Sequence, residues 1–284
     1  MITKESQRIL WNDSGTLRDL TIDLNDFRNN EQVFSYSTGD YLYIGSEAPF
    51  SFRYFDLGVL NTAPAEITVE YWRGNDTWHP AVDVLDETEG FTKSGYISWK
   101  TDRNSDSWTR EQDSFDVTGL TGTVIYNMFW LRISFDVDLD VTTEIDTINF
   151  KFSDDDQLYG RYPDLNNQLI KDNFERGFPS GTKTDWNEQH YIAAEAIVRD
   201  IKKKNYAFSG DQIIDFELFE EAGQHKAAEL IYGAMGGEGY EMNRKRAREY
   251  YNDAMNQGFM RLDQNMNARL DCGEKQVRQV NLQR

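Results

Sequence analysis

The sequence predicts an α+β protein in which an antiparallel β-sandwich of jelly-roll type precedes a helical bundle with an extended tail. From about residue 15 to 152, short runs of strand-forming residues alternate with polar ones and are separated by Asn, Asp, Gly and Ser clusters. This pattern is typical of the strands of a sandwich. After Ser153 the apolar spacing becomes helical. A chain of 284 residues is long enough to form two such domains.

The expected strands are short and rich in aromatic and β-branched residues. They are Leu20-Ile22-Leu24, Tyr41 to Ile44, Phe50-Phe52-Tyr54, Ile67-Val69-Tyr71, Tyr96-Ile97-Trp99 and Val124 to Phe135. The pair Asn75-Asp76 after Gly74 is most simply a hairpin turn. We expect the sandwich domain to span residues 1–152.

Residues 153–183 mix turn formers with isolated aromatic residues, so we expect an ordered linker there. A helix is then predicted to begin near Asp185, because Asp185 and Glu188 have the spacing of a capping box. The run Lys202-Lys203-Lys204 lies where cations favour the C-terminus of a helix.

Two further helices are expected in the second half. One covers Gln212 to Tyr232, with Gly223 as a break or kink and Gly236-Gly237 as its stop. The other runs from Glu238 to about Leu270. The helical domain therefore spans 184–271, and residues 272–284 form a tail with too few apolar anchors to fold alone.

The charge is unevenly distributed along the chain. The formal net charge is -19, and residues 1–155 contain about 28 acidic against about 12 basic residues. The sign reverses from Arg244 to Arg284. Because affinity for a phosphate backbone comes mainly from Lys and Arg, an acidic body disfavours sequence-tolerant binding to nucleic acid. The basic C-terminal segment could contact nucleic acid or an acidic protein surface, or could be a solvated helix face.

The sequence contains few features that indicate a cellular compartment. The single cysteine, Cys272, cannot form an internal disulfide, which fits a reducing cytoplasm. The first fifteen residues lack the continuous apolar core of a signal peptide, and no window reaches the eighteen apolar residues of a membrane span. We therefore expect cytoplasmic synthesis and no membrane partner.

The stretch from Thr68 to Lys100 contains three tryptophans and a run of acids. Trp72, Trp78 and Trp99 could form a stacking surface for sugar or a contact with another subunit, and Trp108 could extend it. In that case Asp83, Asp86 and Glu87 would bind hydroxyl groups. Strand alternation, however, places Tyr71 and Trp72 on opposite faces, which favours packing within the sheets.

No catalytic set, cofactor or metal site is predicted. Asp136, Asp138 and Asp140 alternate as calcium ligands can, but no glycine turn completes a cage, so a solvated strand face is favoured. The cluster Asp154-Asp155-Asp156 is interpreted as a solvated turn. His79, His190 and His225 have no partner at metal or triad spacing, and residues 233–239 lack the Lys-Ser or Lys-Thr of a phosphate loop.

The helical half resembles a known family. The pattern TDWNEQHYIAAEAIVRDIKKK, then DQIIDFELFEEAGQHKAAELIYGAM, then a long tyrosine-bearing helix is similar to the helical domain of tailed-phage head-to-tail adaptor (neck or connector) proteins. The opening half resembles β-sandwich domains of tailed-phage virion proteins. There the resemblance lies in Val69-Glu70-Tyr71-Trp72, in Ser94 to Trp99, and in Phe129-Trp130-Leu131-Arg132.

This resemblance implies a structural virion protein without enzymatic activity, located in the neck or tail and synthesised in the host cytoplasm. It implies a homo-oligomeric ring of twelve copies beneath the portal, which connects capsid and tail and lets genomic DNA pass through its lumen without specific binding. The portal protein and the next neck or tail protein would be its partners. Lys275, Arg278 and Arg284 would dock on the portal.

Two other classes of function stay open from the residues. A carbohydrate-binding or receptor-binding virion module of the baseplate or tail would use the aromatic sandwich. A glycan hydrolase would need a carboxylate pair beside a cleft, and nothing in the sequence selects one.

Overall fold

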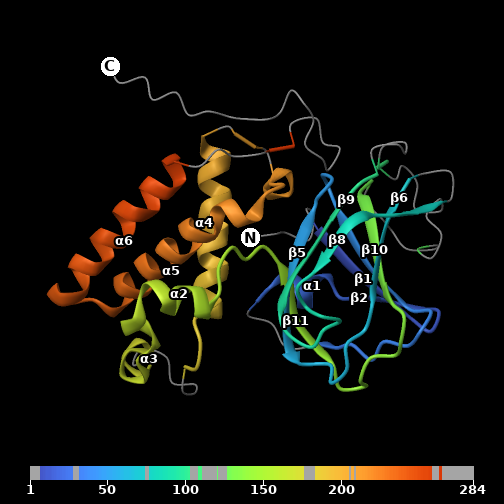
Figure 1. The fold of residues 1–284 in the computed structure, drawn as a ribbon, viewed down its shortest axis with the longest axis horizontal. Coiled ribbons are helices and arrows are strands. Elements are labelled where there is room, and N and C mark those ends of the chain that lie inside the picture. The colour runs from blue at the N-terminus through green and yellow to red at the C-terminus, as the bar shows by residue number, and fades with distance from the viewer. Residues whose placement is uncertain are drawn as a thin grey trace. The chain divides into compact units, whose positions relative to one another are not determined.

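The computed structural model describes residues 7–27, 32–73, 77–102, 108–110, 120, 127–175, 183–204, 206–207, 209–257 and 262–263. The expected α+β class is confirmed, because these residues form two antiparallel sheets and six α-helices (Figure 1). They divide into two compact units. The sheet unit comprises the described residues up to Asn149 together with Asp211–Ile214 and Asp263, and the helical unit comprises those in Phe150–Gly210 and Asp215–Leu262.

The first sheet, sheet A, has the strand order β2-β1-β4-β10-β6-β7. Its strands are β1 (Gln7–Asp13), β2 (Thr16–Asp19), β4 (Tyr41–Ser46), β6 (Ile67–Trp72), β7 (Trp78–Pro80) and β10 (Phe129–Phe135). Every pairing is antiparallel. The pairing of Trp72 with Trp78 makes β6 and β7 a hairpin, and the expected turn residues between them lie outside the described residues.

The second sheet, sheet B, has the order β3-β11-β5-β9-β8. Its strands are β3 (Gln32–Val33), β5 (Phe52–Val59), β8 (Val82–Asp86), β9 (Gly95–Lys100) and β11 (Glu144–Asn149). Alternate residues of both sheets enter one shared hydrophobic core, for example Ile9 and Trp11 from sheet A and Ile97 and Trp99 from sheet B. The two sheets therefore pack face to face, as their period-two pattern predicts.

A second apolar cluster covers the outer face of sheet A. It consists of Leu10, Tyr43, Trp72, Leu120, Met128 and Trp130. Gly45 permits this layer, because a Cβ there would lie 2.9 Å from the ring of Trp130, its cross-strand partner. Both faces of sheet A are thus apolar, which explains why its strands are so aromatic.

One expected strand is wrong. Residues around Leu20-Ile22-Leu24 form the short helix α1 (Thr21–Asn25). Leu20 and Leu24 are buried while Ile22 is 62% exposed, so the apolar spacing is that of one helical turn rather than of a strand. Thr21 fixes the turn to β1, because its Oγ1 accepts a hydrogen bond from the Ile9 amide (3.1 Å).

The helical unit begins earlier than expected. Within residues 153–183, interpreted as a linker, lie α2 (Asp155–Arg161), η1 (Pro163–Asn166) and α3 (Gln168–Glu175). Leu158 and Leu165 are fully buried in the core of the unit, so this segment is part of the domain. Each of these short helices buries only one apolar residue. The apolar spacing of the sequence is therefore too short to reveal them as helices.

The remaining helices are α4 (Asn187–Lys203), η2 (Gly210–Gln212), η3 (Phe216–Phe219), α5 (Glu220–Met235) and α6 (Glu238–Gln257). The lysine run does end α4, and Gly236, at φ 65°, ends α5 as expected. Gly223 does not break α5. Instead of one helix from Gln212, two short 3-10 segments precede α5. Helix α6 is described as far as Gln257, Leu262 and Asp263 are not helical, and the rest of the stretch to Leu270 lies outside the described residues.

A buried ion pair joins a late segment of the chain to the sheets. The guanidinium of Arg53 on β5, fully buried, donates to Asp211 Oδ1 (2.5 Å) and to Gln7 Oε1 (2.6 Å). Ser46 Oγ donates to the other Asp211 oxygen (2.6 Å). Burial lowers the pKa of Arg53, and the adjacent Asp211 carboxylate opposes that shift. Asp211 therefore provides the counter-charge inside the sheet unit.

The pair predicts a large stability effect. Arg53→Met leaves the Asp211 carboxylate buried without its cation, so we expect the free energy of unfolding to fall by about 3–5 kcal/mol. Arg53→Met combined with Asp211→Leu should recover part of that loss. The measurement is urea unfolding followed by tryptophan fluorescence, since six of the seven tryptophans lie in residues 1–149.

The matched control is Arg18→Met in the same unit. The nearest carboxylate oxygen of Asp13 lies 3.8 Å from Arg18, and the two side chains are 36% and 44% exposed, so this change should cost less than about 1 kcal/mol. Equal losses for the two single variants would contradict the role of the buried pair.

Candidate functional site

The tryptophan stretch does not form a binding platform. Tyr71 faces the shared core and Trp72 faces the outer cluster, as strand alternation predicts. Trp72 is 2% exposed and Trp99 is 1% exposed, so neither can stack on a sugar or contact a subunit. Trp78 is half-buried against the ring of Trp72, with centroids 5.4 Å apart. The interpretation of these three side chains as a joint contact surface is therefore wrong.

The acids near this stretch have local roles. Asp83 pairs with Lys100 (3.0 Å) across β8 and β9. Asp86 accepts from the Thr88 amide, the Thr88 hydroxyl and the Gly90 amide, and so shapes the loop that follows β8. They are bound within their own hairpin instead of pointing together toward a ligand.

The three alternating aspartates also point to separate partners. Asp136 accepts from the Glu66 amide, Asp138 from the amide and hydroxyl of Thr38, and Asp140 from the Thr62 amide. Each carboxylate ties down a different loop, so the three do not converge as calcium ligands must. Among the described residues no group of His, Cys, Asp and Glu is arranged to hold a metal ion.

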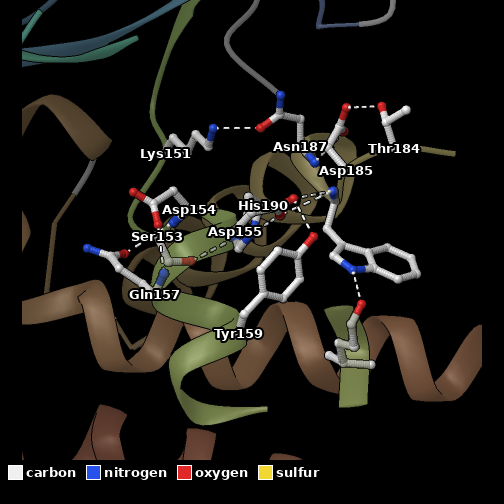
Figure 2. Close-up of polar contacts among 12 residues, drawn as sticks. Lys151, Ser153, Asp154, Asp155, Gln157, Tyr159, Thr184, Asp185, Asn187 and His190 are labelled. Atoms are coloured by element: carbon white, nitrogen blue, oxygen red, sulfur yellow. Dashed lines mark hydrogen bonds and ion pairs between the residues drawn. The ribbon is translucent and has the colours of Figure 1, made fainter. Parts of the chain in front are cut away.

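The helical unit contains a polar network that the sequence analysis missed (Figure 2). His190 on α4 bonds through Nδ1 to Ser153 Oγ (2.9 Å) and through Nε2 to Asp155 Oδ1 (3.1 Å). Because an ionised carboxylate only accepts, Nε2 carries the proton and the Ser153 hydroxyl donates to Nδ1. This hydroxyl, imidazole and carboxylate are connected in the order found in a nucleophilic triad.

Asp155 is saturated by structural bonds. Besides His190, its carboxylate accepts from the Tyr159 hydroxyl (2.7 Å) and from the Trp186 amide (3.2 Å). Burial pushes the pKa of Asp155 up, but the bonds from His190 and Tyr159 outweigh burial and hold it below its ordinary value. The aspartate cluster is thus not a solvated turn. Asp154 caps α2 through a reciprocal capping box with Gln157.

The N-terminus of α4 is organised by the same network. The expected capping box at Asp185 is absent, because α4 begins at Asn187 and Trp186 occupies the cap without a side-chain cap bond. Asp185 instead accepts from the Asn187 amide (3.0 Å), and Lys151 Nζ donates to Asn187 Oδ1 (2.7 Å). The network therefore joins the start of α2 to the start of α4.

The triad-like group is closed to substrates. Ser153 is 2% exposed and His190 is 1% exposed. Gly223 on α5 lies over the hydroxyl, since a Cβ at that position would be 2.8 Å from Ser153 Oγ. A nucleophile needs space for an acyl or phosphoryl group beside its oxygen. The helix backbone fills that space, so this arrangement acts as a structural clamp.

The tail residues expected to dock on the portal, Lys275, Arg278 and Arg284, lie outside the described residues. His225, the third histidine, lies on α5 and lines a cavity of the helical unit. His79 is half-buried on β7, with its Nε2 3.8 Å from Asp102 Oδ2. Among the described residues, no helix has the length and apolar composition that a membrane span requires.

The comparisons with known proteins do not indicate a function for these residues. No protein-family model and no curated protein matches the chain. A solved structure described as CpGH89CBM32-6, produced by Clostridium perfringens, is 12% identical over 52% of this chain and 94% of that chain, with a TM-score of 0.30. Function is therefore inferred from the residues of this chain.

Gly223 gives a direct test of the clamp. Gly to Ala inside a helix normally stabilises by about 1 kcal/mol. Here the new methyl group would press on Ser153 Oγ, so Gly223→Ala should instead lower the free energy of unfolding by about 1–3 kcal/mol. Gly233→Ala on the same helix, where the nearest atom would lie 3.4 Å away on the flexible side chain of Arg244, should be neutral or stabilising. Unfolding followed by circular dichroism at 222 nm checks both, and stabilisation by Gly223→Ala would contradict the close packing.

The clamp also predicts a dependence on pH. Burial lowers the pKa of His190 below the 6.5 of the unfolded chain, so the unfolded chain takes up the proton first as pH falls. The stability that neutral His190 contributes is complete above about pH 6.5 and is lost progressively below it. Asp155 adds a second loss only below about pH 3.8.

We therefore expect His190→Gln to flatten the decline of unfolding free energy between about pH 6.5 and 5. His79→Gln, which removes a partly exposed imidazole from the sheet unit, is the control for the loss of one histidine. The measurement is chemical unfolding at a series of pH values, and an unaltered slope in His190→Gln would exclude a buried neutral imidazole.

Proposed function

We propose that the protein is a structural virion protein of a tailed phage, a head-to-tail adaptor whose copies form a ring beneath the portal. The observation that carries this proposal is the free edge of sheet B. Strand β8 pairs with β9 on one side, and on its other side no described residue forms a strand pair with it. Such an edge offers backbone donors and acceptors to another chain.

The side chains of β8 suit a protein contact. Val82, Val84 and Leu85 are 39%, 37% and 48% exposed along a single five-residue strand. Three exposed aliphatic residues at one sheet edge exceed the isolated apolar residues that ordinary surfaces carry. A neighbouring copy that covered this edge with a different part of its own surface would make a heterologous contact, which is the kind that closes into rings.

The order of the helices is consistent with the proposed adaptor role. Helices α4, α5 and α6 follow one another in the order on which the adaptor resemblance rests, and α6 packs along α5 (Figure 1). In the proposed particle the helical unit surrounds the lumen, the acidic surplus keeps passing DNA from binding, and Lys275, Arg278 and Arg284 meet the portal. The proposal includes jelly-roll connectivity of the sandwich, an arrangement in two domains, and location in the neck or tail of the virion.

The ring contact is tested by Val84→Lys. The lysine would place a charge on the exposed edge and leave the folded core untouched, so we expect rings to disappear while the circular dichroism spectrum stays unchanged. Val141→Lys is the control, because Val141 is 75% exposed in a turn outside β8. Negative-stain electron microscopy and native mass spectrometry of the full-length protein give the readout.

A second arm addresses the portal. Reversal of Lys275, Arg278 and Arg284 to Glu should preserve rings but abolish copurification with the portal protein of the same virus. Reversal of Lys202, Lys203 and Lys204, an equal change of charge at the end of α4, should not. A chain that stays monomeric and binds no portal in its native form would refute the adaptor function.

A further inference from the structure

The helical unit contains a cavity of about 300 Å³ beside the clamp helices. Residues at the end of α2, in η1, on α5 and on α6 line it. This volume is at the lower end of the range of small-ligand sites and suits a group of one or two amino-acid side chains. None of its lining residues takes part in the His190 network.

The base of the cavity is rigid and aromatic. Tyr232 and His225 on α5 are 2% and 3% exposed. The Tyr232 hydroxyl hydrogen-bonds both carboxylate oxygens of Asp164 (3.0 and 2.8 Å), so that carboxylate already has a donor. The ring of Tyr162 stands edge-on to the rings of both Tyr232 and His225, with centroids about 6 Å apart. A planar or apolar group can pack against these rings.

The Tyr162 hydroxyl at the cavity is already bonded to His225. Its oxygen lies 2.7 Å from His225 Nδ1. On the other side of the imidazole, Nε2 lies 3.4 Å from Arg161 Nη1, a donor, and 3.5 Å from Glu221 Oε1, an acceptor. Burial, followed by the nearby Arg161 charge, lowers the pKa of His225. Tyr162 therefore offers a ligand chiefly the face of its ring.

Arg246, at the mouth of the cavity, is a cation without an ion pair among the described residues. Arg161 already donates to Glu221 Oε1 (2.8 Å) and to Gln224 Oε1 (2.8 Å). Arg246 is exposed on α6 and makes no ion pair with any residue that the structure describes. Tyr250, one turn further along α6, is 46% exposed, and its ring centroid lies 5.3 Å from that of His225. A guanidinium and an aromatic ring thus stand side by side at the entrance.

We propose that this cavity binds a monoanionic carboxylate attached to an aromatic ring, with Arg246 as its donor. Carboxylates match the forked donors of arginine, and the ring would lie among Tyr162, Tyr232 and Tyr250. The two arginines, Arg161 and Arg246, and the two acids, Asp164 and Glu221, together carry no net charge, so one carboxylate is accommodated at lower electrostatic cost than a phosphate dianion. The site is independent of ring formation, since all its residues belong to one helical unit.

Calorimetric titration of the full-length protein tests the site with three probes. 4-Hydroxyphenylacetate represents a free aromatic acid, N-acetyl-Glu-Tyr-amide represents a protein segment, and inorganic phosphate represents a compact oxyanion. We expect at least one of the two carboxylates to bind and phosphate to bind at least tenfold more weakly. The tighter carboxylate identifies the source of the natural ligand.

Variants tie the binding to the cavity. Arg246→Gln should weaken binding of the carboxylate roughly tenfold or more, because it removes the charge-assisted hydrogen bonds to the anion. Lys245→Gln removes the same charge from the neighbouring, 71% exposed position of α6 and should leave affinity unchanged. Circular dichroism confirms that each variant is folded.

Three outcomes would overturn the proposal. One is the absence of heat with both carboxylates at millimolar concentration. Another is an equal loss of affinity in Lys245→Gln and Arg246→Gln, which would reflect general attraction to charge. The third is phosphate binding as tight as that of the carboxylates.

Discussion

The fold depends on a cation enclosed in the sheet unit. Arg53 has no exposed surface, and an arginine keeps its charge in nearly all protein environments, so the protein must supply a counter-charge inside. Asp211 supplies it, and Ser46 and Gln7 satisfy further bonding positions of the pair. The requirement explains why a segment between the helices belongs to the sheet unit.

The helical unit also encloses a polar group that needs hydrogen-bond partners, but that group is not a cation. Its buried polar group is a neutral imidazole. The charge beside it is the Asp155 carboxylate, which accepts from three donors, His190, Tyr159 and the Trp186 amide. Two helix starts converge on that one carboxylate. The same residue types could support nucleophilic catalysis. Whether they act in catalysis or in packing depends on whether a substrate can reach the Ser153 hydroxyl. Gly223 brings the backbone of α5 over Ser153, and the group becomes part of the packing.

Local signals predicted much of the fold. Alternation located β4, β6 and β9 and put Tyr71 and Trp72 on opposite faces, and Gly236 marked the end of α5. The short helices before residue 183 were not predicted, because a helix of two turns buries a single apolar residue and is too short to show a helical repeat. The candidate sites were not predicted for a different reason. Ser153 and His190 meet across 37 positions, and only tertiary packing brings them together.

The sequence separation of Arg53 and Asp211 also affects how the protein is made. The two residues lie 158 positions apart. At about 5–20 residues per second, a ribosome needs roughly ten to thirty seconds to supply the aspartate after the arginine. Until then the sheets cannot close over Arg53 without enclosing an unbalanced charge. The sheet unit, which includes Asp211–Ile214, is therefore completed only after α2 to α4 have been synthesised, so the order of synthesis is not the order in which the two units are completed.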